Sequence, residues 1–77
     1  MTLSDLKLDE IGIINKISCS PEIKKRFLDL GFVKDTKISP VLTSPSGNIR
    51  AYLIKDTLIA IRNEDALKIL IQMKTNL

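Results

Sequence analysis

Histidine and tryptophan are absent from this chain of 77 residues, and cysteine occurs only once. Without histidine, the chain lacks the side chain that most often acts as a general base near neutral pH. One thiol without imidazoles cannot form the nitrogen and sulfur cage that zinc requires, and the nine carboxylates show no recognisable spacing for an oxygen-ligand site. We therefore predict no catalytic residues, no metal ligands and no bound cofactor.

The scarcity of cysteine also bears on location. A single thiol cannot form an internal disulfide, whereas small secreted domains usually carry several, so a reducing cytoplasm is predicted. Cys19 precedes a predicted helix, where a thiol can be activated, but a small half-buried turn residue is the simpler interpretation. No segment resembles a signal peptide or the apolar run of a membrane helix. We expect the protein to reach a membrane only through a partner.

Aromatic residues are few, and the charge is only mildly basic. Two phenylalanines and one tyrosine leave the core to aliphatic side chains, and the net charge is +3. A basic surface would suit nucleic acid, but the aromatic residues that stack on bases are scarce, so a solvated basic face is the competing interpretation. The basic residues concerned are Lys24, Lys25, Arg26, Lys34, Lys37, Arg50 and Arg62. The length predicts a single domain over residues 1–77.

One helix is predicted over about residues 21–30. Ser20 suits the N-cap, and the proline that follows it suits the first helical position. Gly31 falls where a helix C-terminus requires positive φ, which glycine adopts without steric cost. Phe32 can then fold back onto Phe27, the apolar contact that accompanies a Schellman cap. The chain should leave this helix in a fixed direction.

Strands are predicted on both sides of this helix. In the first, Ile11, Ile13 and Ile17 share one parity, which Asn15 interrupts. In the second, Pro40 marks an edge or a bulge. The four predicted strands cover residues 11–17, 36–43, 49–54 and 57–62.

The connections between these strands differ in how clearly the residue types predict them. Residues 44–48 give the clearest loop signal, with Gly47 as its structural turn residue. Lys55 and Asp56 join two strands as a hairpin, although neither is the glycine or asparagine that tight hairpin turns prefer. Leu3 and Leu6 fit a short helical turn near the N-terminus.

The C-terminal segment is ambiguous from its pattern alone. Asn63 suits a helix N-cap, and the helical period continues as far as Met73. However, residues 69–73 also alternate apolar and polar side chains as a strand does, and short apolar runs do not decide between the two.

Several sequence pieces together resemble the FeoA-like family (ferrous iron transport protein A). The resemblance covers about residues 3–71. It implies a mainly β fold, a small SH3-like β-barrel with the helix inserted after the first strand and a short helical turn before a closing strand at 69–73. The pieces that carry it are Leu3-Ser4-Asp5-Leu6, Arg26-Phe27-Leu28-Asp29-Leu30-Gly31-Phe32, Pro45 with Gly47, and Ala60-Ile61-Arg62 before Ala66 and Ile69.

The resemblance also implies a function. Proteins of this family are non-enzymatic cytosolic accessories of the FeoB membrane transporter, which imports ferrous iron and carries a cytosolic GTPase domain. The alternative is a stand-alone SH3-like module that regulates or binds nucleic acid. Unpaired barrel edges would also allow a homo-oligomer. The residues that we expect to bind the partner are Lys24, Lys25, Leu28 and Phe32, and the residues with structural roles are Gly31 and Gly47.

Two departures from the family pattern concern turns. The family often has glycine where this chain has Asp9 and Asp35. Aspartate tolerates the left-handed backbone region better than most residues, so both turns are expected to survive.

Overall fold

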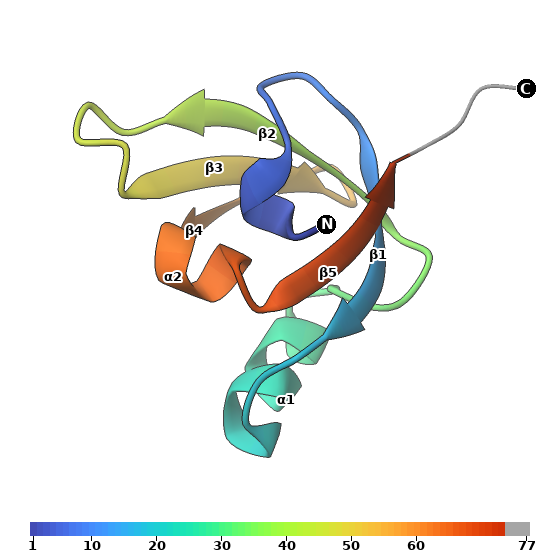
Figure 1. The fold of residues 1–77 in the computed structure, drawn as a ribbon. Coiled ribbons are helices and arrows are strands. Elements are labelled where there is room, and N and C mark those ends of the chain that lie inside the picture. The colour runs from blue at the N-terminus through green and yellow to red at the C-terminus, as the bar shows by residue number, and fades with distance from the viewer. Residues whose placement is uncertain (74–77) are drawn as a thin grey trace, which may run out of the picture.

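The computed structural model describes residues 1–73 and contains one antiparallel sheet of five strands in the order β4-β3-β2-β1-β5 (Figure 1). The strands are β1 (Gly12–Ile17), β2 (Lys37–Thr43), β3 (Ile49–Ile54), β4 (Thr57–Arg62) and β5 (Ile69–Met73). The helices are a short 3-10 turn η1 (Leu3–Asp5), α1 (Pro21–Asp29) and α2 (Asn63–Ala66). The mainly β prediction is confirmed, as are the helix after the first strand and the extended final segment. No helix of the described segment is both long and apolar enough to cross a membrane.

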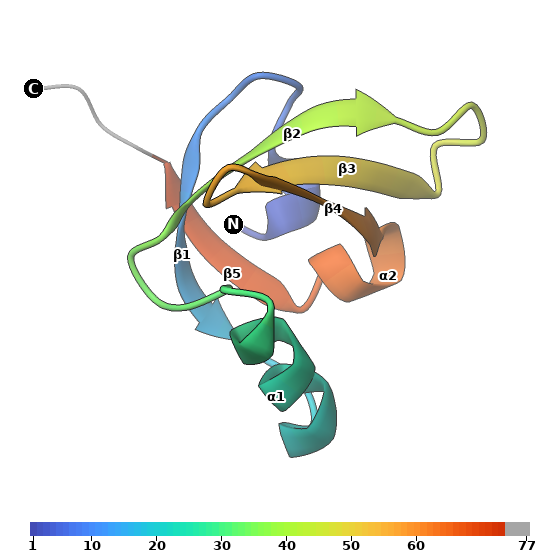
Figure 2. The ribbon, with the colours of Figure 1, turned by 180° about the vertical axis from the view of Figure 1, so that it is seen from behind.

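Pairing along the curved sheet is uneven. β1 pairs with β2 only at Gly12 and Ile13, but with β5 as far as Ile17. β2 carries a register shift between Pro40 and Leu42, so of the two alternatives predicted for the proline, an edge or a bulge, the structure shows the bulge. Figure 2 shows α1 outside the curved sheet, at the end to which β1 leads. α1 therefore lies at the end of the sheet where β1 is paired with β5 and no longer with β2.

One hydrophobic core fills the curved sheet, and it contains both phenylalanines and the tyrosine beside the aliphatic side chains that were expected to form it. Leu3 and Leu6 close it from the N-terminal side, and Phe27 and Phe32 close it from the side of α1. The buried hydrophobic residues are Leu3, Leu6, Ile14, Ile17, Phe27, Phe32, Ile38, Tyr52, Ile54, Ile61, Ala66, Ile69 and Ile71.

The three isoleucines of one parity in the predicted first strand do not share one face. Ile14 and Ile17 are buried, whereas Ile13 is half-buried and Ile11 is exposed. The cause is a register shift in the pairing with β5 between Ile14 and Lys16. A bulge inserts one residue and so reverses the alternation of faces beyond it.

The turns keep the left-handed conformations that their positions require. Asp9 has φ 68° and Asp35 has φ 70°, which confirms that aspartate serves where the family often has glycine. Lys55 and Asp56 have φ 48° and 63°, the positive pair that a two-residue hairpin of type I′ needs. The β3–β4 hairpin therefore closes tightly without glycine.

α2 begins one residue earlier than predicted. Arg62 occupies the N-cap, so Asn63 is the first helical residue rather than the cap. The Asn63 side-chain amide instead donates to the backbone carbonyl of Gly47, which has φ 79°. This bond ties α2 to the loop between β2 and β3.

Candidate functional site

The C-terminus of α1 is fixed by a Schellman cap. Gly31 has φ 99°, and its N–H donates to the Leu28 carbonyl at 3.0 Å. The N–H of Phe32 donates to the Phe27 carbonyl at 2.9 Å, and the centroids of these two phenyl rings lie 5.3 Å apart. The predicted cap and its apolar contact are therefore confirmed.

The N-terminus of α1 is less tightly capped. Ser20 occupies the N-cap and Pro21 the first helical position, as predicted, but the serine side chain makes no capping hydrogen bond. The helix ends at Asp29, and Leu30 is its C-cap. Only Phe27 of α1 is buried, so this helix is attached mainly through its C-terminal end.

α1 separates two surface grooves. The β1-side groove has a volume of about 170 Å³ and is lined by residues 14–17, Lys24, Leu28, Phe32 and Lys34. The β4-side groove has a volume of about 400 Å³ and is lined by Ile23, Arg26, Phe27, Leu30, residues 59–62 and Asp65. Leu28 and Leu30 are 42% and 51% exposed, and each forms part of the wall of one groove.

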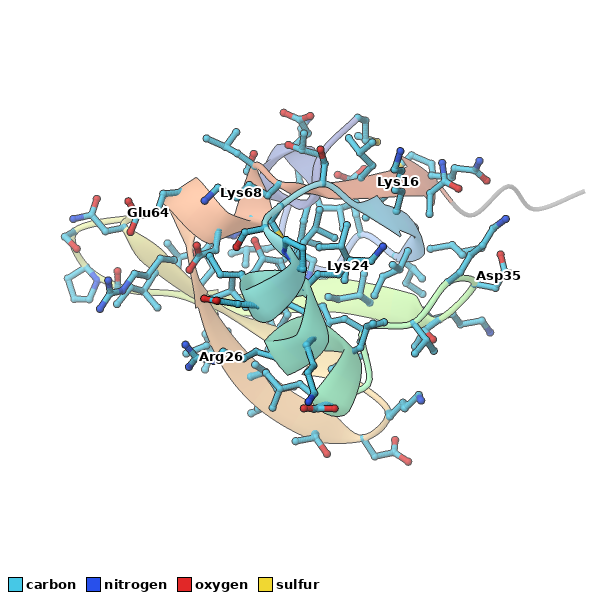
Figure 3. All side chains as sticks on the ribbon, turned by 90° about the horizontal axis from the view of Figure 1, so that it is seen from below. Lys16, Lys24, Arg26, Asp35, Glu64 and Lys68 are labelled. Atoms are coloured by element: carbon cyan, nitrogen blue, oxygen red, sulfur yellow. The ribbon has the colours of Figure 1, made fainter. Side chains whose placement is uncertain are left out.

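The predicted partner-binding residues divide between the surface and the core. Lys24 and Leu28 line the β1-side groove, whereas Lys25 is exposed and lines neither groove. Phe32 has no exposed surface, because the Schellman cap turns its ring into the core, but it also lines the β1-side groove from below, so its role as a partner contact stays a prediction. Figure 3 shows Lys24 and Arg26 on opposite sides of α1. Lys24 and Arg26, which are close together in the sequence, therefore lie on two different surfaces.

Two further lysines line the β1-side groove: Lys34, which the sequence offered only as part of a basic surface, and Lys16, which it did not single out. Lys16 comes from β1 and Lys34 from the segment after α1, and both line the groove with Lys24. No sequence spacing links these three lysines, because the bulge in β1 and the cap of α1 bring them together. Among the described residues, no carboxylate lies within ion-pair distance of any of the three.

Arg50 has a structural role rather than a place on a basic docking surface. Its guanidinium donates to the backbone carbonyls of Ser4 and Leu6 and lies 5.4 Å from the centroid of the Tyr52 ring. These contacts hold the N-terminal segment against β3. The Tyr52 hydroxyl is buried and has no hydrogen-bond partner within the described part of the chain. Burial raises the pKa of Tyr52, and the nearby Arg50 charge lowers it by less.

Tyr52→Phe is expected to keep or raise the free energy of unfolding, by up to about 1 kcal/mol, because it removes a buried hydroxyl without a partner. Since the pKa of Tyr52 is raised in the folded state, ionisation of the unfolded tyrosine should weaken the wild type as the pH rises above about 10. Urea unfolding at neutral and alkaline pH tests both effects. A marked loss of stability in Tyr52→Phe would mean that the hydroxyl has a partner.

The described residues include no group of three or more Cys, Asp or Glu side chains placed to hold a metal ion. Cys19 is half-buried and packs against the core, which agrees with the simpler of its two interpretations. The structure thus contains one groove on each side of α1, and these grooves can bind another molecule.

Comparison with known proteins identifies the family. The family model described as the FeoA domain matches residues 1–73. The chain belongs to the FeoA domain family. The resemblance inferred from the sequence pieces is therefore confirmed, and it extends to the N-terminus.

Relatives of this FeoA domain include a fused protein and free domains. A Porphyromonas gingivalis (strain ATCC BAA-308 / W83) protein named Fe(2+) transport protein A/Fe(2+) transporter FeoB fusion protein is 32% identical over 73 residues. The match covers 95% of this chain but only 9% of that protein. The solution structure of FeoA from Chlorobium tepidum has a TM-score of 0.91 at 24% identity, covering 97% of this chain and 71% of that one. This second likeness concerns the fold.

A third relative supports the fold class. The crystal structure of Stenotrophomonas maltophilia FeoA complexed with zinc has a TM-score of 0.83 at 26% identity. The alignment covers 94% of this chain and 89% of that one. That protein is described as a procaryotic SH3 domain protein, which confirms the predicted SH3-like fold.

Proposed function

We propose that this FeoA domain is a cytoplasmic, non-enzymatic accessory protein of ferrous iron transport that binds the cytosolic part of a FeoB-type transporter. One observation carries the proposal: the P. gingivalis relative joins a segment similar to nearly the whole of this chain to a FeoB transporter. A covalent link holds two domains at high effective concentration. Where the two are separate chains, surface contacts must supply the association instead. The S. maltophilia relative, described in connection with activation of ferrous iron transport, supports the same process.

The composition supports the non-enzymatic part of the proposal. The chain has no histidine, and its single cysteine packs against the core, so the usual general bases and activated nucleophiles are not assembled. The alternative is a regulatory or nucleic-acid-binding module, which the net charge of +3 favours. Binding to nucleic acid would weaken steeply with salt, whereas docking of an apolar surface would not.

Calorimetry with the purified cytosolic region of a FeoB-type transporter from the source organism tests this function. We expect saturable binding by the wild type. Lys24→Glu with Lys25→Glu should leave the free energy of unfolding within about 0.5 kcal/mol of the wild type, because both side chains are exposed. Loss of positive charge at the docking face should slow association.

The contrary outcomes are distinct. If the wild type does not bind that region but binds duplex DNA with an affinity that falls steeply with salt, the partner is nucleic acid and not the transporter. Unchanged binding by the stable double variant would remove the exposed face of α1 from the contact.

The isolated chain is expected to show no stoichiometric, submicromolar site for ferrous iron. The reason is the absence of histidine and the presence of only one thiol. Anaerobic calorimetry with Fe²⁺ measures this directly, and a parallel titration with Zn²⁺ covers the metal named with the S. maltophilia relative. A saturable one-to-one heat for Fe²⁺ would contradict the prediction.

A further inference from the structure

We propose that the β1-side groove binds an acidic extended segment of the protein partner, with one apolar side chain in the groove and carboxylates on its three lysines. This inference rests on the proposed function for the identity of the partner. It adds which surface binds and what chemistry the bound segment has. Lys24 and Leu28 were predicted to contact the partner, and the groove joins them to Lys16 and Lys34.

The groove lies beside the second half of β1. Beyond Ile13, β1 pairs with no further residue of β2, although Ile14 still exchanges backbone hydrogen bonds with Asp35 and Thr36, and β1 stays paired with β5 up to Ile17. α1 then runs past the second half of β1, and Phe32 beneath the groove belongs to the core. The floor is therefore apolar and supported by packed side chains.

The charge of the groove selects an anionic occupant. Lys16, Lys24 and Lys34 come from three separate segments, and no carboxylate is among the lining residues. The carboxylate of Asp35 is also outside the lining, and Figure 3 shows Asp35 to the right of α1, apart from Lys24. The whole chain carries 12 basic and 9 acidic residues, so its charges are nearly balanced. The groove lining has three lysines and no acidic residue, and is therefore a local excess of positive charge. Charge complementarity across an interface steers association and fixes the register of binding.

The size argues against a drug-sized ligand, and the apolar wall favours a peptide segment over a free small anion. A volume of about 170 Å³ is below the range of about 300–1,000 Å³ that small-molecule pockets span. Leu28 is 42% exposed at the wall, and a phosphate or a sugar would leave it uncovered. An apolar side chain flanked by carboxylates would bury Leu28 and neutralise the lysines together.

Charge reversal within the groove tests the proposal on the full chain. The groove variant carries Lys16→Glu, Lys24→Glu and Lys34→Glu. The control carries Lys7→Glu, Lys37→Glu and Lys68→Glu, which changes the net charge equally at exposed lysines outside the groove. Against the cytosolic region of the FeoB-type transporter, we expect the groove variant to associate at least about tenfold more slowly and the control to associate like the wild type. Equal weakening by both variants, or none by the groove variant, would overturn the proposal.

A second measurement keeps this test separate from that of the function. Amide NMR shifts of the wild type are followed on titration with the peptide acetyl-Glu-Asp-Leu-Glu-Asp-amide, its neutral analogue with Gln and Asn, and inorganic phosphate. We expect the acidic peptide alone to shift the amides of Lys16, Leu28 and Lys34. Equal shifts with phosphate would indicate a simple anion site, and shifts located elsewhere would place the acidic segment on another surface. Either result overturns the proposal even if the transporter binds, whereas groove shifts without transporter binding would uphold the groove and reject the proposed partner.

Discussion

Gly31→Val is expected to lower the free energy of unfolding by about 2–4 kcal/mol and the melting temperature by roughly 10–30 °C. The residue has φ 99°, where any side chain is strained and a β-branched one most of all. The left-handed conformation alone costs about 1–2 kcal/mol. The strain also weakens the two cap hydrogen bonds made by the N–H groups of Gly31 and Phe32, each worth about 1 kcal/mol. The total free energy of unfolding of a domain of this size is only about 5 kcal/mol.

Thermal and urea melting of Gly31→Asn beside Gly31→Val separates backbone strain from crowding. Asparagine tolerates the left-handed region, so it should recover much of the loss. The nearest atom that a new Cβ would meet is the Lys55 Cδ at 3.3 Å, in a flexible side chain that can move. If valine and asparagine destabilise equally, crowding rather than the cap conformation explains the effect. A valine variant as stable as the wild type would contradict the role assigned to the glycine.

The features that the sequence predicted depend on local chemistry. The cap of α1 and the bulge at Pro40 each follow from the conformational limits of a few neighbouring residues, whereas the left-handed turns at Asp9 and Asp35 were expected from the family resemblance. The family resemblance added the topology and the extended state of residues 69–73, which periodicity alone could not decide.

The features that the sequence missed depend on where segments meet. A bulge in β1 at Asn15, the residue that interrupts the parity, puts Ile14 rather than Ile13 on the same buried side as Ile17, but parity alone did not predict this shift. The β1-side groove is assembled from β1, α1 and the segment after α1, so Lys16 and Lys34 share no spacing with Lys24. Phe32 was predicted to contact the partner, whereas its ring packs inward.

Phe32→Ala is the second large effect, with an expected loss of about 3–5 kcal/mol in the free energy of unfolding. The side chain has no exposed surface, and its ring lies 5.3 Å, centroid to centroid, from that of Phe27. Its removal deletes apolar burial and leaves a cavity that the capped backbone of α1 cannot fill by collapsing. Because the loss approaches the whole stability of a small domain, much of the variant should be unfolded at 37 °C. Urea unfolding followed by circular dichroism measures the change.

Leu28→Ala is the matched control, since Leu28 lies four residues earlier and is 42% exposed. A partly exposed leucine contributes little to folding, so its variant should unfold within about 1 kcal/mol of the wild type. It should nevertheless bind the transporter region more weakly, because the wall of the β1-side groove is lost. Leu58→Ala, at a leucine 56% exposed on β4, provides a second surface control and should bind normally. If Phe32→Ala instead folded as stably as the wild type and lost binding, the phenyl ring would be a partner contact after all, and α1 would have to move away from the core when the partner binds.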